Sequence, residues 1–145
     1  MDYLVLATQL LDSMQAMHKF KSQKHLNEAM QGEAFVLRYI MMQSGDVIPS
    51  EISGEMGVSS ARIATALNSL ENKGLITRQI DLSDRRKIIV GITPEGKALA
   101  ERQRQAVITG ASKMLALLGE QDAKEYIRIM GRLAEIMATN RIELL

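Results

Sequence analysis

The chain contains no cysteine. Without thiols it can form no disulfide, thiolate nucleophile or thiol redox switch. It also lacks any apolar run close to the ~18 residues that indicate a membrane-spanning helix. The opening segment, "MDYLVLATQLLDSMQ", has no basic leader, and Thr8, Gln9 and Asp12 interrupt its apolar residues. We therefore expect no membrane partner and a cytoplasmic location.

Residue patterns that support enzyme chemistry are missing too. The sequence shows no Ser-His-Asp arrangement, no paired carboxylates and no phosphate-binding loop. Its two histidines, His18 and His25, are separated by roughly 10 Å if they lie on one helix, which is too far to share an ion without other ligands. We predict that the protein is not an enzyme, has no metal site and uses no cofactor.

What the sequence does contain is typical of one ordinary globular domain. It has 145 residues, of which 46% are hydrophobic and 24% charged. The net charge is only +1, but the segment from Ser59 to Lys87 contains six basic residues and only three acidic ones. A cluster of this size is often just a solvated surface, so its meaning depends on the structure around it.

Amphipathic helices are predicted at both ends of the chain. Apolar residues recur at spacings of three and four within 3–17 and again within 123–137. Thr93 and Pro94 are typical of a helix start, and the helix after them runs for about twenty-five residues to an end at Gly119. The two stripes consist of Leu4, Ala7, Leu11, Met14 and Met17, and of Ala123, Tyr126, Ile127, Met130, Leu133 and Met137.

Three shorter helices are predicted in the first half of the chain, between these ends. The segment "EAFVLRYIMMQSG" forms the first of them. Pro49 suits the first turn of the second, which Gly57 can end in a left-handed conformation. Either Ser59 or Ser60 can cap the third helix.

The third helix has two unlike faces. At 100° per residue, Ile63, Leu67 and Leu70 share one face, and small or polar residues share the other, with Arg62 at its flank. Short hydrogen-bonding groups suit a close approach to base edges in a major groove. For any one of them, the alternative is an ordinary exposed helix surface. The polar face comprises Ala61, Thr65, Asn68, Ser69 and Asn72.

Two β-branched runs follow this helix. "LITRQI" and "KIIVGI" are joined by the short charged turn "DLSDRR", a pattern that predicts a two-stranded ribbon. A helix, a turn, a second helix and a ribbon in this order make a winged helix.

With these elements in order, the sequence resembles the MarR family of winged helix-turn-helix transcriptional regulators over nearly its whole length. "D-x-x-D-R-R" at 81–86, followed by Val90, Ile92, Thr93 and Gly96, is similar to the wing of that family. "EISGEMGVSSARIATALNSLENKGLI" is similar to its helix-turn-helix. One departure is Gly54, where a stronger helix former is common, at a local cost of ~1 kcal/mol relative to Ala.

The resemblance implies a mainly α fold with a small β-ribbon wing, flanked by N- and C-terminal dimerisation helices. Residues 1–145 then form a single MarR-like domain, with a DNA-binding region at 32–93 and a dimerisation region at 1–31 and 94–145. Because the winged helix already has its own core, we expect the apolar stripes to pair in a homodimer. The dimerisation residues are predicted to be Leu4, Leu11, Tyr126, Met130, Leu133 and Met137.

The charged turn can be interpreted residue by residue. Alternate residues on a strand share a face, so we expect Asp84 and Arg86 to point to one side and Arg85 and Lys87 to the other. Asp84 would then accept hydrogen bonds from a neighbouring guanidinium. Arg86 would be free to enter a narrow minor groove, as the resemblance also implies. The alternative is a solvated hairpin tip.

The function expected from these features is that of a sequence-specific DNA-binding regulator, a repressor on a pseudo-palindromic operator. The resemblance implies release by a small apolar or aromatic effector bound between the dimer region and the winged helix. The alternative is a winged helix that serves as a protein-interaction or scaffold module. The predicted DNA contacts are Ser59, Ser60, Ala61, Arg62, Thr65, Asn68, Ser69 and Asn72 in the helix, and Asp84, Arg85, Arg86 and Lys87 in the wing.

Overall fold

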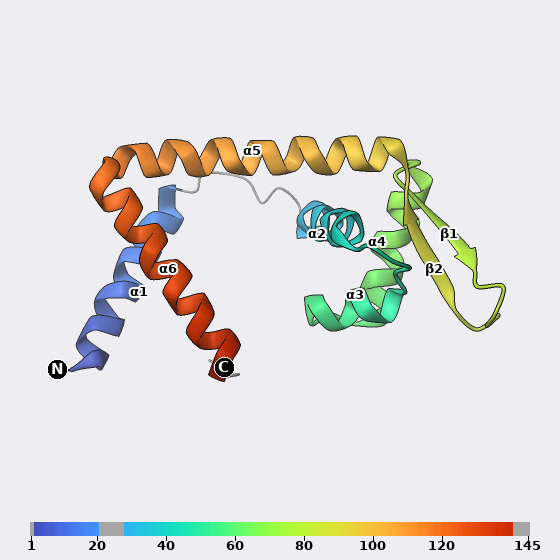
Figure 1. Ribbon diagram of the computed structural model, residues 1–145, viewed down its shortest axis with the longest axis horizontal. Coiled ribbons are helices and arrows are strands. Elements are labelled where there is room, and N and C mark those ends of the chain that lie inside the picture. The colour runs from blue at the N-terminus through green and yellow to red at the C-terminus, as the bar shows by residue number, and fades with distance from the viewer. Residues whose placement is uncertain (1, 21–27, 141–145) are drawn as a thin grey trace.

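The computed structural model describes residues 2–20 and 28–140. Within these ranges the protein is mainly helical with one two-stranded antiparallel sheet, which confirms the predicted fold class. The long helix α5 (Pro94–Leu118) runs along the molecule and joins its two ends (Figure 1). The winged-helix elements lie at one end, and α1 (Tyr3–Phe20) and α6 (Glu120–Asn140) lie at the other.

The winged helix consists of α2 (Glu28–Met42), α3 (Pro49–Met56), α4 (Ser60–Asn72), β1 (Ile76–Ile80) and β2 (Ile88–Ile92). Here α2 packs against α4 and α5, and α3 packs against α4. We call residues 28–100, which include the start of α5, the head. Its buried core consists of Val36, Leu37, Ile40, Val47, Ile52, Ile63, Leu67, Leu70, Ile76, Val90 and Ala100.

The turn between α3 and α4 follows from local chemistry. Pro49 occupies the first turn of α3, where a backbone N–H would have no partner within the helix, so proline's lack of one costs nothing. Gly57 ends the helix with φ 63°, a conformation that costs glycine little. Beyond it, the Val58 N–H donates to the Ser53 carbonyl at 3.3 Å, and the Ser53 hydroxyl donates to the Val58 carbonyl at 2.6 Å. These bonds fix the angle at which α4 leaves α3.

The expected two-stranded ribbon forms, and its antiparallel register runs from Ile76 opposite Ile92 to Ile80 opposite Ile88. A third segment joins it. The Val90 N–H donates to the Val47 carbonyl at 2.7 Å, in an isolated bridge that ties the loop before α3 to β2. A one-residue bridge leaves no periodicity in the sequence, so the sequence pattern did not predict it.

The start of α5 is attached to the base of the wing. Thr93 caps the helix as expected, since its Oγ1 accepts from the Gly96 N–H at 3.0 Å. The same hydroxyl donates to the Gly74 carbonyl at 2.8 Å. Gly96 packs so closely that a Cβ there would lie 2.0 Å from the Leu75 carbonyl oxygen. The direction of α5 is therefore set by the head.

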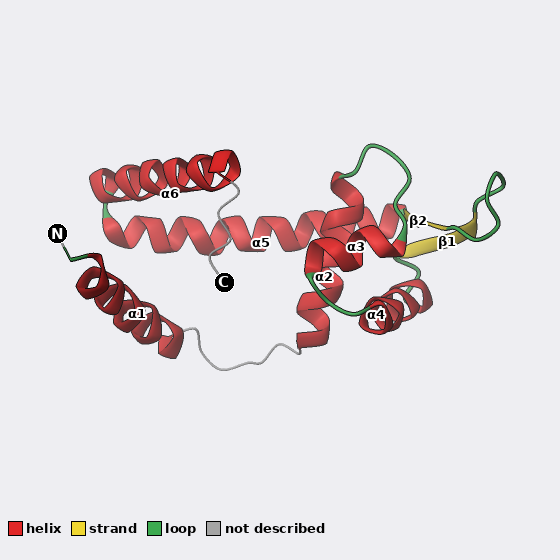
Figure 2. Ribbon diagram, turned by 90° about the horizontal axis from the view of Figure 1, so that it is seen from below, coloured by secondary structure: helices red, strands yellow, loops and turns green. Residues whose placement is uncertain are grey.

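The other end of the molecule is more open. Gly119, at φ 78°, ends α5, and α6 turns back and packs against it (Figure 2). In α1, every side chain from 3 to 17 is exposed. We call α1, the rest of α5 and α6 the arm (residues 3–20 and 101–140). None of the helices in the described ranges is long and apolar enough to cross a membrane.

Candidate nucleic-acid interface

The start of α4 is held by a side-chain cap. Ser59 has an extended backbone, and its Oγ accepts a hydrogen bond from the Arg62 N–H at 3.3 Å. This satisfies one of the amides that a helix start leaves without a partner. Of the two serines considered for this role, Ser59 is therefore the cap and Ser60 is the first helical residue. Both side chains are exposed.

The two faces of α4 differ as helical periodicity predicts. Ile63, Leu67 and Leu70 are each no more than 2% exposed and pack into the head. The opposite side is exposed and carries only short side chains, with Arg62 exposed beside it. The Thr65 hydroxyl donates to the carbonyl of its own helix one turn back, at 3.0 Å. The exposed members of the polar face are Ala61, Thr65, Asn68 and Asn72.

Ser69 does not lie fully on this face, contrary to the sequence-based expectation. Its side chain is half-buried, and it lies on the side of α4 near Glu33 of α2, where it helps lower the pKa of that carboxyl. Lys73 donates to the Glu33 carboxylate, at 2.7 Å. Burial raises the pKa of Glu33. The side chains of Lys73 and Ser69 together lower it by more than burial raises it, so the pKa lies below its ordinary value. Ser69 and Lys73 thus help attach α4 to α2.

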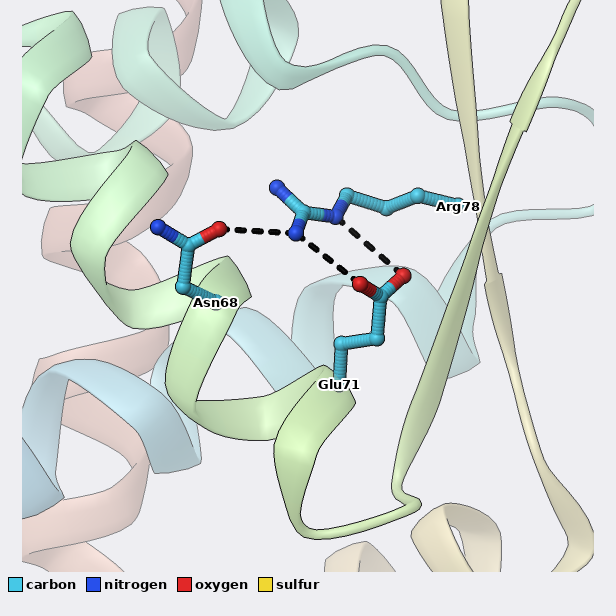
Figure 3. Close-up of polar contacts among 3 residues, drawn as sticks. All are labelled: Asn68, Glu71 and Arg78. Atoms are coloured by element: carbon cyan, nitrogen blue, oxygen red, sulfur yellow. Dashed lines mark hydrogen bonds and ion pairs between the residues drawn. The ribbon is translucent and has the colours of Figure 1, made fainter.

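Asn68 has a partner that the sequence analysis missed. Arg78 of β1 donates through Nη2 to the Asn68 Oδ1 at 2.7 Å (Figure 3). Its Nη2 and Nε also donate to the Glu71 carboxylate at 3.0 and 3.3 Å. The Arg78 hydrogen bond lowers the pKa of Glu71 below its ordinary value. These contacts connect α4 to the wing, whereas in the sequence Arg78 is only one of the six cations between Ser59 and Lys87.

The wing turn also differs from the expected arrangement. Residues 81–87 form a turn rather than strand, so the argument from strand alternation was wrong there. The Asp84 Oδ1 accepts from the Arg86 backbone N–H at 3.1 Å, not from a guanidinium. Asp81 Oδ1 accepts from both the N–H and the hydroxyl of Ser83, at 2.9 and 2.8 Å. Both carboxylates shape the backbone of the turn, which is a common role for aspartate.

The cations of the turn remain exposed. Arg85, Arg86 and Lys87 make no side-chain hydrogen bond or ion pair within the part of the chain that the structure describes. The Asp81 N–H donates to the Lys87 carbonyl at 2.9 Å, which closes the hairpin beneath them. Three positive side chains therefore project from a turn whose backbone is held by hydrogen bonds.

The predicted dimerisation residues lie at the opposite end of the molecule, on the arm. Leu4 and Leu11 of α1 are 79% and 57% exposed. In α6, Tyr126, Met130 and Leu133 are nearly half exposed, and Met137 is less exposed than these. Large apolar side chains at this exposure are costly to hydrate in a lone chain. The α6 members are Tyr126, Met130, Leu133 and Met137.

The described side chains include no group of three or more His, Asp or Glu that could hold a metal ion. Of the two histidines considered at the sequence level, His25 and the side chain of His18 lie outside the described parts of the structure.

Known proteins with similar sequences are transcriptional regulators, in agreement with this arrangement of α4 and the wing. Residues 32–88 match the family model described as "MarR family", and this range contains both α4 and the wing turn. Over 145 residues the chain is 32% identical to the uncharacterized HTH-type transcriptional regulator YwhA of Bacillus subtilis, covering 93% of this chain and 100% of YwhA. The chain belongs to the MarR family. It is a transcriptional regulator and not an enzyme.

Solved structures of the MarR type share its architecture. The YusO protein from Bacillus subtilis superposes with a TM-score of 0.72 at 26% identity, covering 93% of this chain and 99% of YusO. The transcriptional repressor CouR, solved bound to a 23-mer DNA duplex, superposes with a TM-score of 0.59 at 25% identity, covering 70% of this chain and 71% of CouR. This MarR-family chain therefore has the winged-helix fold of known DNA-binding regulators.

Proposed function

We propose that the protein is a sequence-specific repressor that binds double-stranded DNA as a homodimer. The observation that carries the proposal is the pairing of two surfaces at one end of the molecule (Figure 1). One is the exposed, short-chained polar face of α4, and the other is the exposed cationic turn at 85–87. A regulator of this kind acts where the DNA is, so the proposal includes a cytoplasmic location.

The chemistry of the two surfaces suits two different grooves. A major groove about 12 Å wide admits a helix, and small polar side chains let the α4 backbone approach the base edges. The neighbouring minor groove, where narrow, has an enhanced negative potential that attracts arginine. The MarR resemblance implies that Arg86 is the side chain that enters the minor groove, and Arg85 and Lys87 then face phosphates. Asp84 holds the turn so that these side chains start from a fixed backbone.

A homodimer follows from the exposed apolar side chains of α1 and α6. Two copies that bury these stripes against each other present two α4 helices related by a two-fold axis. Such a pair binds a pseudo-palindrome whose half-sites lie one helical turn, about 34–36 Å, apart.

The wing is tested by comparing two cations. Arg86→Ala is expected to reduce the favourable free energy of binding to the operator by about 1 to 3 kcal/mol and to change binding to random DNA little. The operator is first obtained by selection from a pool of random duplexes. Lys87→Ala is expected to weaken binding to both duplexes alike and to lower the salt slope by about one unit. Asp84→Ala keeps all three cations but loosens the turn, so its loss should be intermediate. Titrations at several salt concentrations measure each effect.

Equal losses on both duplexes for Arg86→Ala would show that it is only another phosphate contact. Absence of any salt-dependent DNA binding in the wild type would support the alternative, a winged helix that serves as a protein-interaction module. The small and polar side chains on the exposed face of α4 argue against that alternative, because a protein-docking face is expected to present an apolar patch.

We also propose release by a small apolar or aromatic ligand bound between arm and head. The support is geometric: α5 carries each head rigidly, so a ligand that favours one spacing of the two heads changes operator affinity. Benzoate and phenol are suitable probes, with thermal shift and operator release as the two measurements. The mechanism would be contradicted if every compound of a broader aromatic panel stabilised the protein against heat without releasing the operator.

A further inference from the structure

Asn68 is the one exposed member of the α4 polar face that β1 constrains. Its Oδ1 accepts the Arg78 Nη2–H at 2.7 Å. Asn72, on the same face, makes no side-chain hydrogen bond within the described residues. Figure 3 shows the Asn68 oxygen directed toward Arg78 and its amide nitrogen directed away. The wing therefore controls which end of this amide is free.

The orientation of the amide is dictated by the chemistry of arginine. A guanidinium carries five N–H donors and no acceptor, so it can face the oxygen of Asn68 but not its NH₂ group. Arg78 is itself held by Glu71 through two hydrogen bonds to the carboxylate, at 3.0 and 3.3 Å. The Arg78 side chain is 26% exposed, so it is partly shielded from water. The free end of Asn68 is thereby its NH₂ group, which can only donate.

Resting on the function proposed above, we propose that Arg78 is a positioning residue that determines operator specificity by making Asn68 a pure donor. An unconstrained asparagine pairs with adenine, because its oxygen accepts from N6 and its nitrogen donates to N7. Because Arg78 occupies one of the two lone pairs of this oxygen and the oxygen is turned toward β1, that two-bond pair is disfavoured. Guanine offers two adjacent acceptors, O6 and N7, and thymine offers O4, whereas cytosine presents a donor. As a donor, Asn68 is expected to prefer guanine, to bind thymine through O4 or adenine through N7 alone less well, and to reject cytosine.

The test is a selection of bound duplexes from a randomised pool, followed by sequencing. Asn68→Ala identifies the base pair that Asn68 contacts, as the position in each half-site where preference is lost. At that position the wild type is expected to favour guanine over adenine by about tenfold. The double variant Glu71→Leu with Arg78→Met removes both charges, so the net charge of the head is unchanged. It is expected to abolish or reverse this preference while binding to random duplex stays the same.

A second variant retains the Arg78 contact. In Asn68→Asp one carboxylate oxygen still accepts from Arg78, and the other replaces the outward donor with an acceptor. The preferred base should change from guanine to cytosine, whose N4 donates. This variant keeps the outcome decisive if the double variant does not fold. The matched control is Glu125→Leu with Arg128→Met, which removes an ion pair of the same fork geometry from α6 and should leave base preference unchanged.

The outcomes separate this inference from the proposed function. If the wild type enriches no sequence, both the repressor proposal and the role of Arg78 are overturned. If the wild type selects an operator with adenine at the Asn68 position, the inference alone is wrong. The inference also fails if Asn68→Asp and the folded double variant keep the guanine preference, or if the α6 control changes it equally.

Discussion

The apolar residues of the head are mostly buried, whereas those of the arm are mostly exposed. Every buried hydrophobic residue of the described structure lies between Val36 and Ala100, in the head. All but four of the large apolar side chains that are exposed belong to the arm. The head has a closed core of its own, whereas the apolar stripes of the arm stay largely exposed within the residues that the structure describes. In a monomer such a surface indicates an interface.

Stability and assembly therefore reside in different regions of the protein. Burial of a large aliphatic side chain contributes about 1.5–3 kcal/mol, so the head gains its free energy of folding within one chain. The arm gains a comparable term only by association. We therefore expect folding of the head and dimerisation through the arm to respond to different substitutions.

The largest expected effect comes from placing a charge on the arm stripe. Leu133→Glu puts an unpaired carboxylate into the proposed interface, which is expected to weaken association by about 3 to 5 kcal/mol per buried charge. Sedimentation velocity at micromolar concentration should show monomer, and circular dichroism should show an intact head. The control Lys124→Glu lies on the opposite side of α6 and should remain dimeric. A Leu133→Glu dimer as tight as the wild type would overturn the comparison.

Next in size is a cavity in the head. Leu67 is 1% exposed, and Leu67→Ala is expected to lower the free energy of unfolding by about 2 to 5 kcal/mol. The midpoint of urea unfolding measures this loss. Sedimentation under native conditions should still show a dimer. If the variant dissociates while folded, then the head and the arm are not independent.

Two glycine substitutions examine the junction between the regions. In Gly96→Ala the new Cβ meets the Leu75 carbonyl oxygen at the start of α5, so the variant should lose about 1 to 3 kcal/mol of stability. Gly54→Ala is the matched control within α3, where a Cβ meets nothing within 4 Å. It should gain up to about 1 kcal/mol. Thermal unfolding of both variants checks the signs, and equal melting temperatures would contradict the close packing at Gly96.

The smallest effect concerns acid stability of the head. The pKa of Glu33 is lowered in the folded protein, so its contribution is present above the unfolded value near 4.3 and is lost as the pH falls through the folded value. Glu33→Gln should therefore reduce stability at about pH 6 by less than ~1 kcal/mol and leave it nearly unchanged at about pH 3. Urea midpoints across this range test the difference. A loss that is constant with pH would rule out the charge as its cause.

The parts of the fold that could be predicted from sequence depend on neighbours in the chain. Thr93 at one helix start and Gly57 and Gly119 at two helix ends were predicted at the residues where the structure has them. Capping bonds span three or four residues, and helical periodicity repeats within one turn, so both are visible in a short window. The ends of helices were less certain. For example, α1 continues past the predicted stripe to Phe20, and α2 begins at Glu28, before the predicted apolar segment.

The candidate site was predictable in outline for the same reason. Periodicity identified the exposed face of α4 and the cationic turn, but not how the two are connected. Ser69 is half-buried rather than exposed, and Asp84 accepts from a backbone amide instead of a guanidinium. A sequence gives the side chains of a surface, whereas their hydrogen-bond partners depend on which elements pack beside them.

By itself, the sequence determined where helices and strands form, which of their faces are apolar, and where positive charge gathers. These properties follow from interactions between residues a few positions apart. Three contacts depend instead on how the elements pack: Val47 joins β2, Gly96 contacts the base of the wing, and Arg78 binds the oxygen of Asn68. Such contacts join residues ten or more positions apart in the chain, and no local pattern encodes them. They exist because burial of the common core brings α4, the ribbon and α5 together.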